Sequence, residues 1–263
     1  MTDASPSSGP GEERQFKSKV ALVVGASKGI GADTARLFAR RGASVVLASR
    51  DVEGLTTVAQ EIQELGQEAL VVPLDLTDDA SIDRLGTEIR TRFGRLDVAF
   101  NNSGEGAPPT DLADVPPATF DLVFRVTVRG TFRAMQQEIP LLLATGGGAI
   151  VNMSSTAGIS AFRGGGPYTA AKHAVIGLSK AAAIDYAQRN VRVNAVAPGP
   201  IETHRMRGLP ETYQEQARQA VPMRRLGMGA EVAEAVVWLG SDAARFVTGV
   251  TLLVDGGRMA GWG

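Results

Sequence analysis

The sequence predicts a single α/β domain built on a doubly wound parallel sheet. Short runs rich in Val, Ile and Leu alternate with longer amphipathic segments along the chain. The short runs are apolar at consecutive positions, as in strands that helices cover on both faces. The chain has 263 residues, no internal repeat and no linker-like stretch in its middle, and this fits one domain of that class.

The order of the elements follows from this alternation. Strands are expected over residues 20–25, 44–49, 69–74, 96–101, 148–153, 191–197 and 250–254. Helices are expected over residues 29–41, 51–65, 79–93, 117–138, 167–188 and 230–240. Strands separated by helices predict right-handed crossovers between parallel strands.

Two segments do not follow this rhythm. Residues 1–15, MTDASPSSGPGEERQ, are rich in Ser, Pro, Gly and Glu and predict a disordered arm that lacks the apolar core of a signal peptide. The domain then covers residues 16–263. Residues 199–228 are polar and contain prolines but no strand pattern, which predicts a lid over the substrate site.

Composition excludes several classes of function. The net charge of −1 provides no basic field for nucleic acid or an anionic membrane, and no apolar run is long enough to span a bilayer. The chain has no cysteine, which excludes disulfides and thiolate metal sites and suits a reducing compartment. Its two histidines, His173 and His204, have no third ligand, so no metal site is predicted. These features predict a cytoplasmic protein with a small-molecule substrate.

A glycine-rich loop follows the first expected strand. Residues 23–31 read VVGASKGIG and place Gly25, Gly29 and Gly31 at the first strand–helix turn. Glycines there let backbone N–H groups approach a phosphate, and the helix N-terminus favours its negative charge. The spacing Gly-x-x-x-Gly-x-Gly differs from the common Gly-x-Gly-x-x-Gly fingerprint. A plain strand–helix turn is the alternative, but the loop favours a bound dinucleotide.

The end of the second strand indicates which dinucleotide is bound. An acidic side chain at this place binds the ribose hydroxyls of NAD, whereas this chain has Ser49 there, followed by Arg50. Arg50 and Lys28 of the glycine loop would supply two cations for the 2′-phosphate of NADP. In the alternative interpretation, Arg50 is a solvated charge that Asp51 neutralises. We expect NADP(H) to be preferred over NAD(H).

A serine, a tyrosine and a lysine form the candidate catalytic group. Tyr168 and Lys172 lie one turn apart in a helix expected to begin at Pro167, and Ser155 follows the fifth strand. Hydride transfer to a carbonyl leaves an alkoxide that needs a proton. Tyrosine, with an ordinary pKa of ~10, becomes a useful acid–base when a cation such as Lys172 is near. Ser155 would hydrogen-bond the carbonyl oxygen. The alternative is an ordinary surface Tyr–Lys pair.

Together these motifs resemble the short-chain dehydrogenase/reductase family, from about residue 16 to residue 258. The matching elements are Gly25-x-x-x-Gly29-Ile30-Gly31, Asn101-Asn102-Ser103-Gly104, Ser155, Tyr168-x-x-x-Lys172, Pro198-Gly199 and the closing FVTGVTLLVDGG. The resemblance implies a Rossmann-like fold with a seven-stranded sheet. It also implies NAD(P)-dependent interconversion of ketones and secondary alcohols.

The resemblance also implies individual roles. Tyr168 would be the general acid/base and Ser155 the carbonyl polariser, while Lys172 would bind the nicotinamide ribose and lower the pKa of the tyrosine. Asp75 would contact adenine, and Thr203 the nicotinamide carboxamide. The expected cofactor contacts are Gly25, Ser27, Lys28, Gly29, Ile30, Gly31, Ser49, Arg50, Asp75, Leu76, Asn101, Asn102, Ser103, Gly104, Tyr168, Lys172, Pro198, Gly199, Ile201 and Thr203.

The chain departs from the family at Thr127, where the family has a fourth catalytic residue, asparagine. That asparagine holds a helix kink and a water that relays protons to the lysine. A threonine hydroxyl can bond the carbonyl four residues earlier and bend the helix, but it lacks the donor and acceptor of an amide. We expect catalysis to persist with Thr127, either through a relay by the backbone carbonyl or with slow turnover.

The departure at Thr127 keeps a second hypothesis open, an NADP(H)-binding redox sensor with little catalysis. Nucleotide-sugar epimerases of the same family fit less well, because they have longer chains and another glycine spacing. The substrate pocket is expected between residues 105–110, 156–166 and the lid, with an apolar wall of Phe162, Met206, Leu209 and Tyr213.

Two further expectations concern partners. Residues 134–162 contain no Lys or Arg, which argues against an acidic acyl-carrier protein as the substrate donor. The resemblance implies a homotetramer assembled through the helices expected over residues 117–138 and 167–188.

Overall fold

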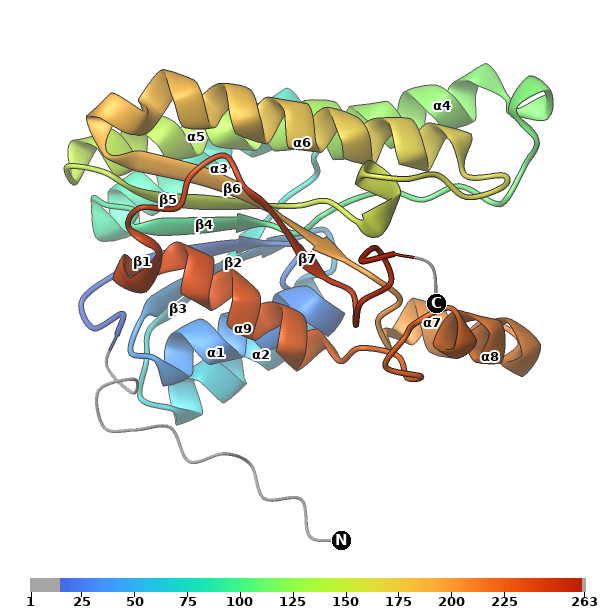
Figure 1. The fold of residues 1–263 in the computed structure, drawn as a ribbon. Helices are drawn as coiled ribbons and strands as arrows, with labels where there is room; N and C mark the ends of the chain where they lie inside the picture. The colour runs from blue at the N-terminus through green and yellow to red at the C-terminus, as the bar shows by residue number, and fades with distance from the viewer. Residues whose placement is uncertain (1–14, 262–263) are drawn as a thin grey trace, which may run out of the picture.

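A seven-stranded parallel sheet forms the centre of the computed structural model, which describes residues 15–261 (Figure 1). The arm expected over residues 1–15 lies, apart from Gln15, outside the described residues. The strands are β1 Val20–Val24, β2 Ser44–Ser49, β3 Ala69–Pro73, β4 Val98–Asn101, β5 Gly148–Met153, β6 Val191–Pro198 and β7 Thr251–Val254. Their order is β3-β2-β1-β4-β5-β6-β7, which confirms the predicted fold class.

The strand order reverses next to β1. The chain builds outward from β1 to β3 and then returns to place β4 on the other side of β1, with Val24 paired to Asn101. In a doubly wound sheet such a reversal opens a crevice beyond the carboxyl ends of the strands. The glycine loop after β1 and the Asn101–Gly104 segment after β4 therefore meet at this crevice.

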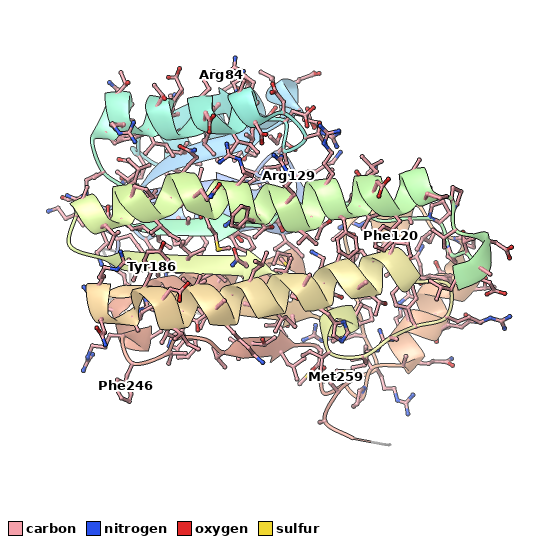
Figure 2. The ribbon with its side chains drawn as sticks, turned by 90° about the horizontal axis from the view of Figure 1, so that it is seen from above. Arg84, Phe120, Arg129, Tyr186, Phe246 and Met259 are labelled. Atoms are coloured by element: carbon pink, nitrogen blue, oxygen red, sulfur yellow. The ribbon has the colours of Figure 1, made fainter. Side chains whose placement is uncertain are left out.

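Helices cover both faces of the sheet (Figure 1). One face carries α1 Gly29–Arg40, α2 Val52–Glu64 and α9 Gly229–Gly240, and the other carries α3 Asp79–Phe93, α5 Gly130–Ala144 and α6 Gly166–Tyr186. Two separate apolar clusters fill the two layers, one on each side of the strands. Figure 2 shows α5 and α6 lying side by side over the second face.

Local signals set the helix ends. The Asp51 carboxylate accepts a hydrogen bond from Gly54 N at the start of α2 (3.0 Å), and Asp78 caps α3 in the same way at Ala80 N (3.0 Å). The helix α3 ends at Gly94, whose φ of +66° suits glycine. These caps explain why α3 has the bounds that the sequence predicts.

Two predicted segments differ from the structure. The single helix expected over residues 117–138 consists of α4 Pro117–Phe124, a π-helical turn Arg125–Arg129 and α5, which continues to Ala144. The expected lid contains two helices, α7 His204–Arg207 and α8 Glu211–Gln219, at one end of the molecule (Figure 1). The sequence analysis did not predict these helices, because they contain few apolar residues and so show no helical apolar period. Among residues 15–261, no helix combines the length and the apolar character that crossing a bilayer requires.

Candidate active site

A cavity of about 260 Å³ opens at the carboxyl edge of the sheet. It is lined by Ile30, Asn102, Gly104, Glu105, Gly106, Met153, Ser154, Ser155, Tyr168, Lys172, Pro198, Gly199, Ile201 and Thr203. These residues come from the ends of β4, β5 and β6 and from the first turns of α1 and α6. Lys172 and Glu105 are the one cationic and the one anionic side chain in this lining.

The glycine loop is folded as a backbone cradle. Gly25 and Gly29 have φ values of +81° and +57°, which L side chains rarely adopt. A Cβ atom on Gly31 would collide with the Gly25 carbonyl, and that carbonyl accepts a hydrogen bond from Asn102 Nδ2 (3.0 Å). The three glycines thus allow a close approach that other residues would block. The N-terminus of α1 faces the cavity through Ile30.

The adenosine side of the expected site carries exposed cations. Lys28 and Arg50 are exposed and make no ion pair or hydrogen bond within residues 15–261. Asp51, which could have neutralised Arg50, uses its Oδ1 to cap α2. Asp75 accepts bonds from Thr77 N and Thr77 Oγ1 (both 2.8 Å).

These two bonds hold the pKa of Asp75 below its usual value, and the nearby charge of Arg50 lowers it further. A carboxylate that stays ionised beside unpaired cations can accept a hydrogen bond from the amino group of a base, while the cations bind a phosphate. Within the part of the chain that the structure describes, the Ser49 hydroxyl bonds only locally: it accepts from Asp51 N (3.1 Å) and donates to Asp51 O (3.4 Å).

The candidate catalytic side chains meet at the cavity, as the sequence predicts. Tyr168 and Lys172 lie in the first turns of α6, and Ser155 follows β5 directly. The Lys172 ammonium lies 5.7 Å from the centre of the Tyr168 ring. Ser155 Oγ accepts a hydrogen bond from Ala157 N (3.1 Å), which fixes the side chain at the start of a short turn while leaving its hydroxyl proton available.

Burial determines the charge state of Lys172. The side chain is 2% exposed, and its Nζ donates a hydrogen bond to Met153 O (2.8 Å). Loss of hydration disfavours the ammonium and lowers the pKa of Lys172 to about 8. A Cβ atom on Gly104 would lie 3.0 Å from this Nζ, so glycine at 104 leaves the lysine room beside the cavity.

Thr127 does not make the bond that the sequence argument allowed. Within residues 15–261 its hydroxyl makes no bond to the carbonyl of residue 123; instead, Thr127 Oγ1 accepts a hydrogen bond from Glu105 N (3.0 Å). The Thr127 carbonyl accepts a bond from Thr131 Oγ1 (2.8 Å). The helix deviates here as a π-helical turn, and the Thr127 hydroxyl ties this turn to the loop after β4.

Glu105 lies in the segment 105–110, which was expected to line the substrate pocket, and its Oε1 accepts a hydrogen bond from Gly106 N (3.2 Å). Two other lining residues, Met153 and Ser154, were not predicted from the sequence. Met153 supplies the carbonyl that holds Lys172, and Ser154 Oγ donates to Lys172 O (3.0 Å). The adjacent serines Ser154 and Ser155 were the sequence signal for a second polar residue at this place. Ser154 donates its hydroxyl hydrogen to the backbone of α6, whereas the Ser155 hydroxyl hydrogen stays available at the cavity.

Phe162, the first residue of the expected apolar wall, lies beside Tyr168 but does not line the cavity. The Phe162 ring lies 6.3 Å from the Tyr168 ring, centre to centre. Met206, Leu209 and Tyr213 do not line the cavity, and Tyr213 is 49% exposed on α8. In this conformation the segment 199–228 reaches the cavity through Gly199, Ile201 and Thr203 at its beginning.

The two histidines lie apart. His173 Nδ1 lies 2.9 Å from the Thr169 carbonyl one turn earlier on α6, and His204 begins α7. Residues 15–261 contain no cluster of three acidic or histidine side chains that could hold a metal ion.

Comparison with known proteins connects this geometry to a family. A family model described as enoyl-(acyl carrier protein) reductase matches residues 25–258. An A-factor type γ-butyrolactone 1′-reductase (1S-forming) of Streptomyces virginiae is 41% identical over 244 residues, covering 91% of this chain and 95% of the relative. A cis-4-hydroxycyclohexanecarboxylate dehydrogenase of Sinomonas cyclohexanicum is 41% identical, covering 93% and 98% of the two chains.

The fold comparison agrees with these sequence matches. The structure is similar to the crystal structure of L-sorbose reductase from Gluconobacter frateurii complexed with NADPH and L-sorbose. The TM-score is 0.90 at 27% identity, and the match covers 95% of this chain and 100% of the other. The chain therefore belongs to the short-chain dehydrogenase/reductase family and is an NAD(P)-dependent oxidoreductase that acts on ketones or alcohols.

Proposed function

We propose that the chain is an NADP(H)-dependent enzyme that interconverts a ketone and a secondary alcohol, with Tyr168 as its general acid/base. The observation that carries this proposal is the meeting of Ser155, Tyr168 and Lys172 on one cavity with the end of the glycine loop. Each has the chemistry that the reaction needs from the protein, and no other titratable side chain except Glu105 lines that cavity.

The nicotinamide cofactor supplies or accepts the hydride. In the reducing direction, Ser155 Oγ–H donates to the substrate carbonyl oxygen and stabilises the charge that grows there. Tyr168 Oη–H gives its proton to that oxygen. The buried Lys172 ammonium, 5.7 Å from the ring, stabilises the tyrosinate that remains, because a cation in a poorly hydrated site interacts strongly with a nearby anion.

The residues of the glycine loop fit a dinucleotide. The positive φ values of Gly25 and Gly29 and the missing Cβ of Gly31 support a phosphate held by backbone N–H groups, with the N-terminus of α1 behind them. In the same proposal, Ser27, Ile30, Ser103, Leu76 and the segment from Pro198 to Thr203 complete the cofactor contacts.

NADP(H) is proposed over NAD(H) because of Lys28 and Arg50. Both are exposed and form no salt bridge within residues 15–261, and Ser49 stands where an acid would repel a phosphate. A guanidinium and an ammonium together match a phosphate dianion better than they match ribose hydroxyls. The sorbose reductase that shares this fold was crystallised with NADPH, which supports the same assignment.

The substrate is proposed to be an uncharged ketone or alcohol. The cavity carries a carboxylate, Glu105, that would repel a second anion. The absence of Lys and Arg between residues 134 and 162 argues further against docking of an acidic carrier protein.

Steady-state turnover tests this proposal. Purified protein is mixed with NADPH or NADH and a panel of cyclic and acyclic ketones, and cofactor absorbance is followed. NADPH oxidation by at least one ketone class, faster than NADH oxidation, is expected. Tight NADPH binding without turnover on the whole panel would favour the redox-sensor hypothesis instead.

A further inference from the structure

A glutamate is fully buried beneath the active site. Glu138 of α5 is 0% exposed, and its Oε2 accepts a hydrogen bond from Asn101 Nδ2 at the carboxyl end of β4 (3.1 Å). Neither the catalytic nor the cofactor-binding roles above use this carboxyl group. A buried carboxylate without a cationic partner is among the most costly groups that a protein core can contain.

Glu138 belongs to a continuous row of buried polar side chains. The second hydrogen of Asn101 Nδ2 goes to Asn152 Oδ1 on β5 (2.9 Å), and Asn152 Nδ2 donates to Ser179 Oγ on α6 (3.0 Å). Ser179 Oγ in turn donates to Val175 O (2.7 Å). Asn152 Nδ2 also donates to Met135 Sδ of α5 (3.4 Å), so every hydrogen in the row has an acceptor, and the row connects α5, β4, β5 and α6.

Two acceptors in this row remain without a partner. They are Asn101 Oδ1 and Glu138 Oε1, on the two residues that the 3.1 Å bond already joins. If Glu138 were ionised, both oxygens would be buried acceptors with no donor. A proton on Glu138 Oε1 gives Asn101 Oδ1 its donor and makes Oε1 a donor, so that a single proton resolves both defects.

We propose that Glu138 is a neutral carboxylic acid paired with the Asn101 carboxamide by two opposed hydrogen bonds. Asn101 Nδ2 donates to Glu138 Oε2, and Glu138 Oε1 donates to Asn101 Oδ1. Asn101 keeps its other amide hydrogen for Asn152. Glu138 is then a positioning residue that holds the carboxyl ends of β4 and β5 side by side.

The surroundings of Glu138 agree with a neutral acid. Burial raises the pKa of Glu138 to about 8, with the bond from Asn101 acting in the opposite direction. The charged side chains on the elements packed against it either have other contacts or are exposed, as Arg84 and Glu88 of α3 are. Asp83 of α3 pairs with Arg133 on the exposed side of α5, and the Lys172 ammonium of α6 binds Met153 O. Arg192 of β6 donates to carbonyls beside α9, beyond the opposite face of the sheet.

Asn101 and its partner Asn152 each lie one residue away from a group of the active site. Asn101 precedes Asn102, which donates to Gly25 O in the glycine loop. Asn152 precedes Met153, whose carbonyl holds the Lys172 ammonium. A shift of β4 against β5 would move the cofactor loop relative to the catalytic lysine. This positioning role rests on the proposed function, whereas the protonation state of Glu138 does not.

Three variants test the proposal. Glu138→Gln places an N–H donor where the acid proton stands and preserves the double hydrogen bond. Glu138→Leu removes it and leaves Asn101 Oδ1 and one of the two Asn101 Nδ2 hydrogens without a partner, while the bond to Asn152 remains. Glu88→Gln on α3 is the matched control, because Glu88 is an exposed helical glutamate with no partner within residues 15–261.

Protonation is measured without any catalytic assay. In the infrared difference spectrum of wild type minus E138Q at pH 7, we expect the carbonyl stretch of a protonated carboxylic acid, which the difference with E88Q lacks. The stability of the pair is fully present below pH 4.5 and is lost as the pH rises to about 8. Wild type should therefore lose stability relative to E138Q by about tenfold in the folding constant per pH unit in that window.

Positioning is measured by NADPH binding through fluorescence titration. E138L is expected to bind NADPH at least about fivefold more weakly than wild type, and E138Q should recover most of that loss. An acid band that is absent, with an E138Q-to-wild-type stability difference that stays constant from pH 4.5 to 8, would overturn the neutral pair. An E138L protein that binds NADPH as wild type does would overturn the positioning role. Neither result depends on whether a ketone is turned over.

Discussion

At the scale of single residues, the protonation of Lys172 is the equilibrium most sensitive to pH near neutrality. Burial at 2% exposure lowers the pKa of this lysine to about 8, so at pH 7 only about a tenth of the molecules lack the ammonium. Below pH 8 the charge that stabilises a tyrosinate is present, and above pH 8 it is lost. Catalysis by Tyr168 should therefore depend on pH in the alkaline range.

For carbonyl reduction, we expect kcat/KM to be level below pH 8 and to fall as the pH rises above it, because both Lys172 and Tyr168 must hold their protons. The pH profile of ketone reduction measures this. Lys172→Arg, whose guanidinium stays charged, should move the decline to higher pH in whatever activity remains. E138Q should keep the wild-type decline. A rate that climbs steadily through pH 8 would contradict the role of Lys172.

The cofactor preference is also decided by single residues. Replacing Arg50 by Asp and Lys28 by Ala removes two cations and adds a negative charge beside the expected 2′-phosphate. We expect KM for NADPH to rise at least about tenfold while KM for NADH changes little, since a hydrogen bond to a charged group contributes about 1.5–3 kcal/mol. Arg84→Asp on α3, exposed and without an ion pair within residues 15–261, is the control (Figure 2). An unchanged NADPH-to-NADH ratio would count against the phosphate assignment.

The sequence identified Lys28 and Arg50 as candidate phosphate ligands, but it could not exclude the alternative that Asp51 neutralises Arg50. Whether Asp51 neutralises Arg50 depends on where the carboxylate points, and that became clear only from its bond to Gly54 N. The burial of Glu138 could not be predicted from the sequence, because a single glutamate in an amphipathic helix normally lies on the exposed face. The same periodicity that predicts α5 says nothing about an acid that enters the core.

At the scale of elements, the π-helical turn Arg125–Arg129 is the feature that links the helical layer to the site. It places Thr127, 0% exposed, so that its hydroxyl binds Glu105 N in the loop after β4. The π-turn adds a residue to the helical ladder, and such turns are frequent at functional sites. Thr127 thus fixes the loop through a side-chain acceptor.

Thr127→Val has nearly the same shape but leaves Glu105 N without an acceptor, at a cost of about 1–3 kcal/mol. We expect NADPH affinity to fall about tenfold in T127V, because the Asn101–Gly104 segment loses its anchor. T127S, which keeps the hydroxyl, should bind NADPH within about threefold of wild type. Calorimetric titration of both variants measures the effect, and equal affinities would show that the bond does not hold the loop.

Elements with strong local signals were predicted best. The strands β2 and β5 and the helix α3 have the predicted bounds, because apolar runs or caps mark both of their ends. The division of 117–138 into α4, the π-turn and α5 was missed, since a π-turn leaves the apolar period almost unchanged. The helices α7 and α8 were missed because α8 has no buried residue and so lacks an apolar stripe.

At the scale of the whole molecule, apolar side chains remain exposed on the helical layer over one face of the sheet. Phe120 and Leu122 of α4, Phe132 of α5 and Ile184 of α6 are 41–79% exposed (Figure 2 labels Phe120). Their helices are those through which the family resemblance implies assembly. We therefore propose that this layer is an interface of a homotetramer.

Ile184 is 79% exposed on α6, about three turns from Lys172, so a charge there should not disturb the catalytic side chains. We expect wild type to elute as a tetramer and Ile184→Glu to shift toward smaller species, because burying a carboxylate opposes association. Light scattering after gel filtration measures the mass. Gln60→Glu on α2 adds the same charge on the opposite face and should leave the mass unchanged. A monomeric wild type would contradict the proposed interface.

The proposed catalysis depends on proton transfer by Tyr168 next to a bound NADPH. The most direct measurement compares Tyr168→Phe with wild type, using NADPH fluorescence titration for binding and NADPH absorbance for turnover of the best ketone. We expect Y168F to bind NADPH within about threefold of wild type and to turn over at least about a thousandfold more slowly, since the proton donor alone is removed. Turnover within about tenfold of wild type in Y168F would contradict the proposed catalysis.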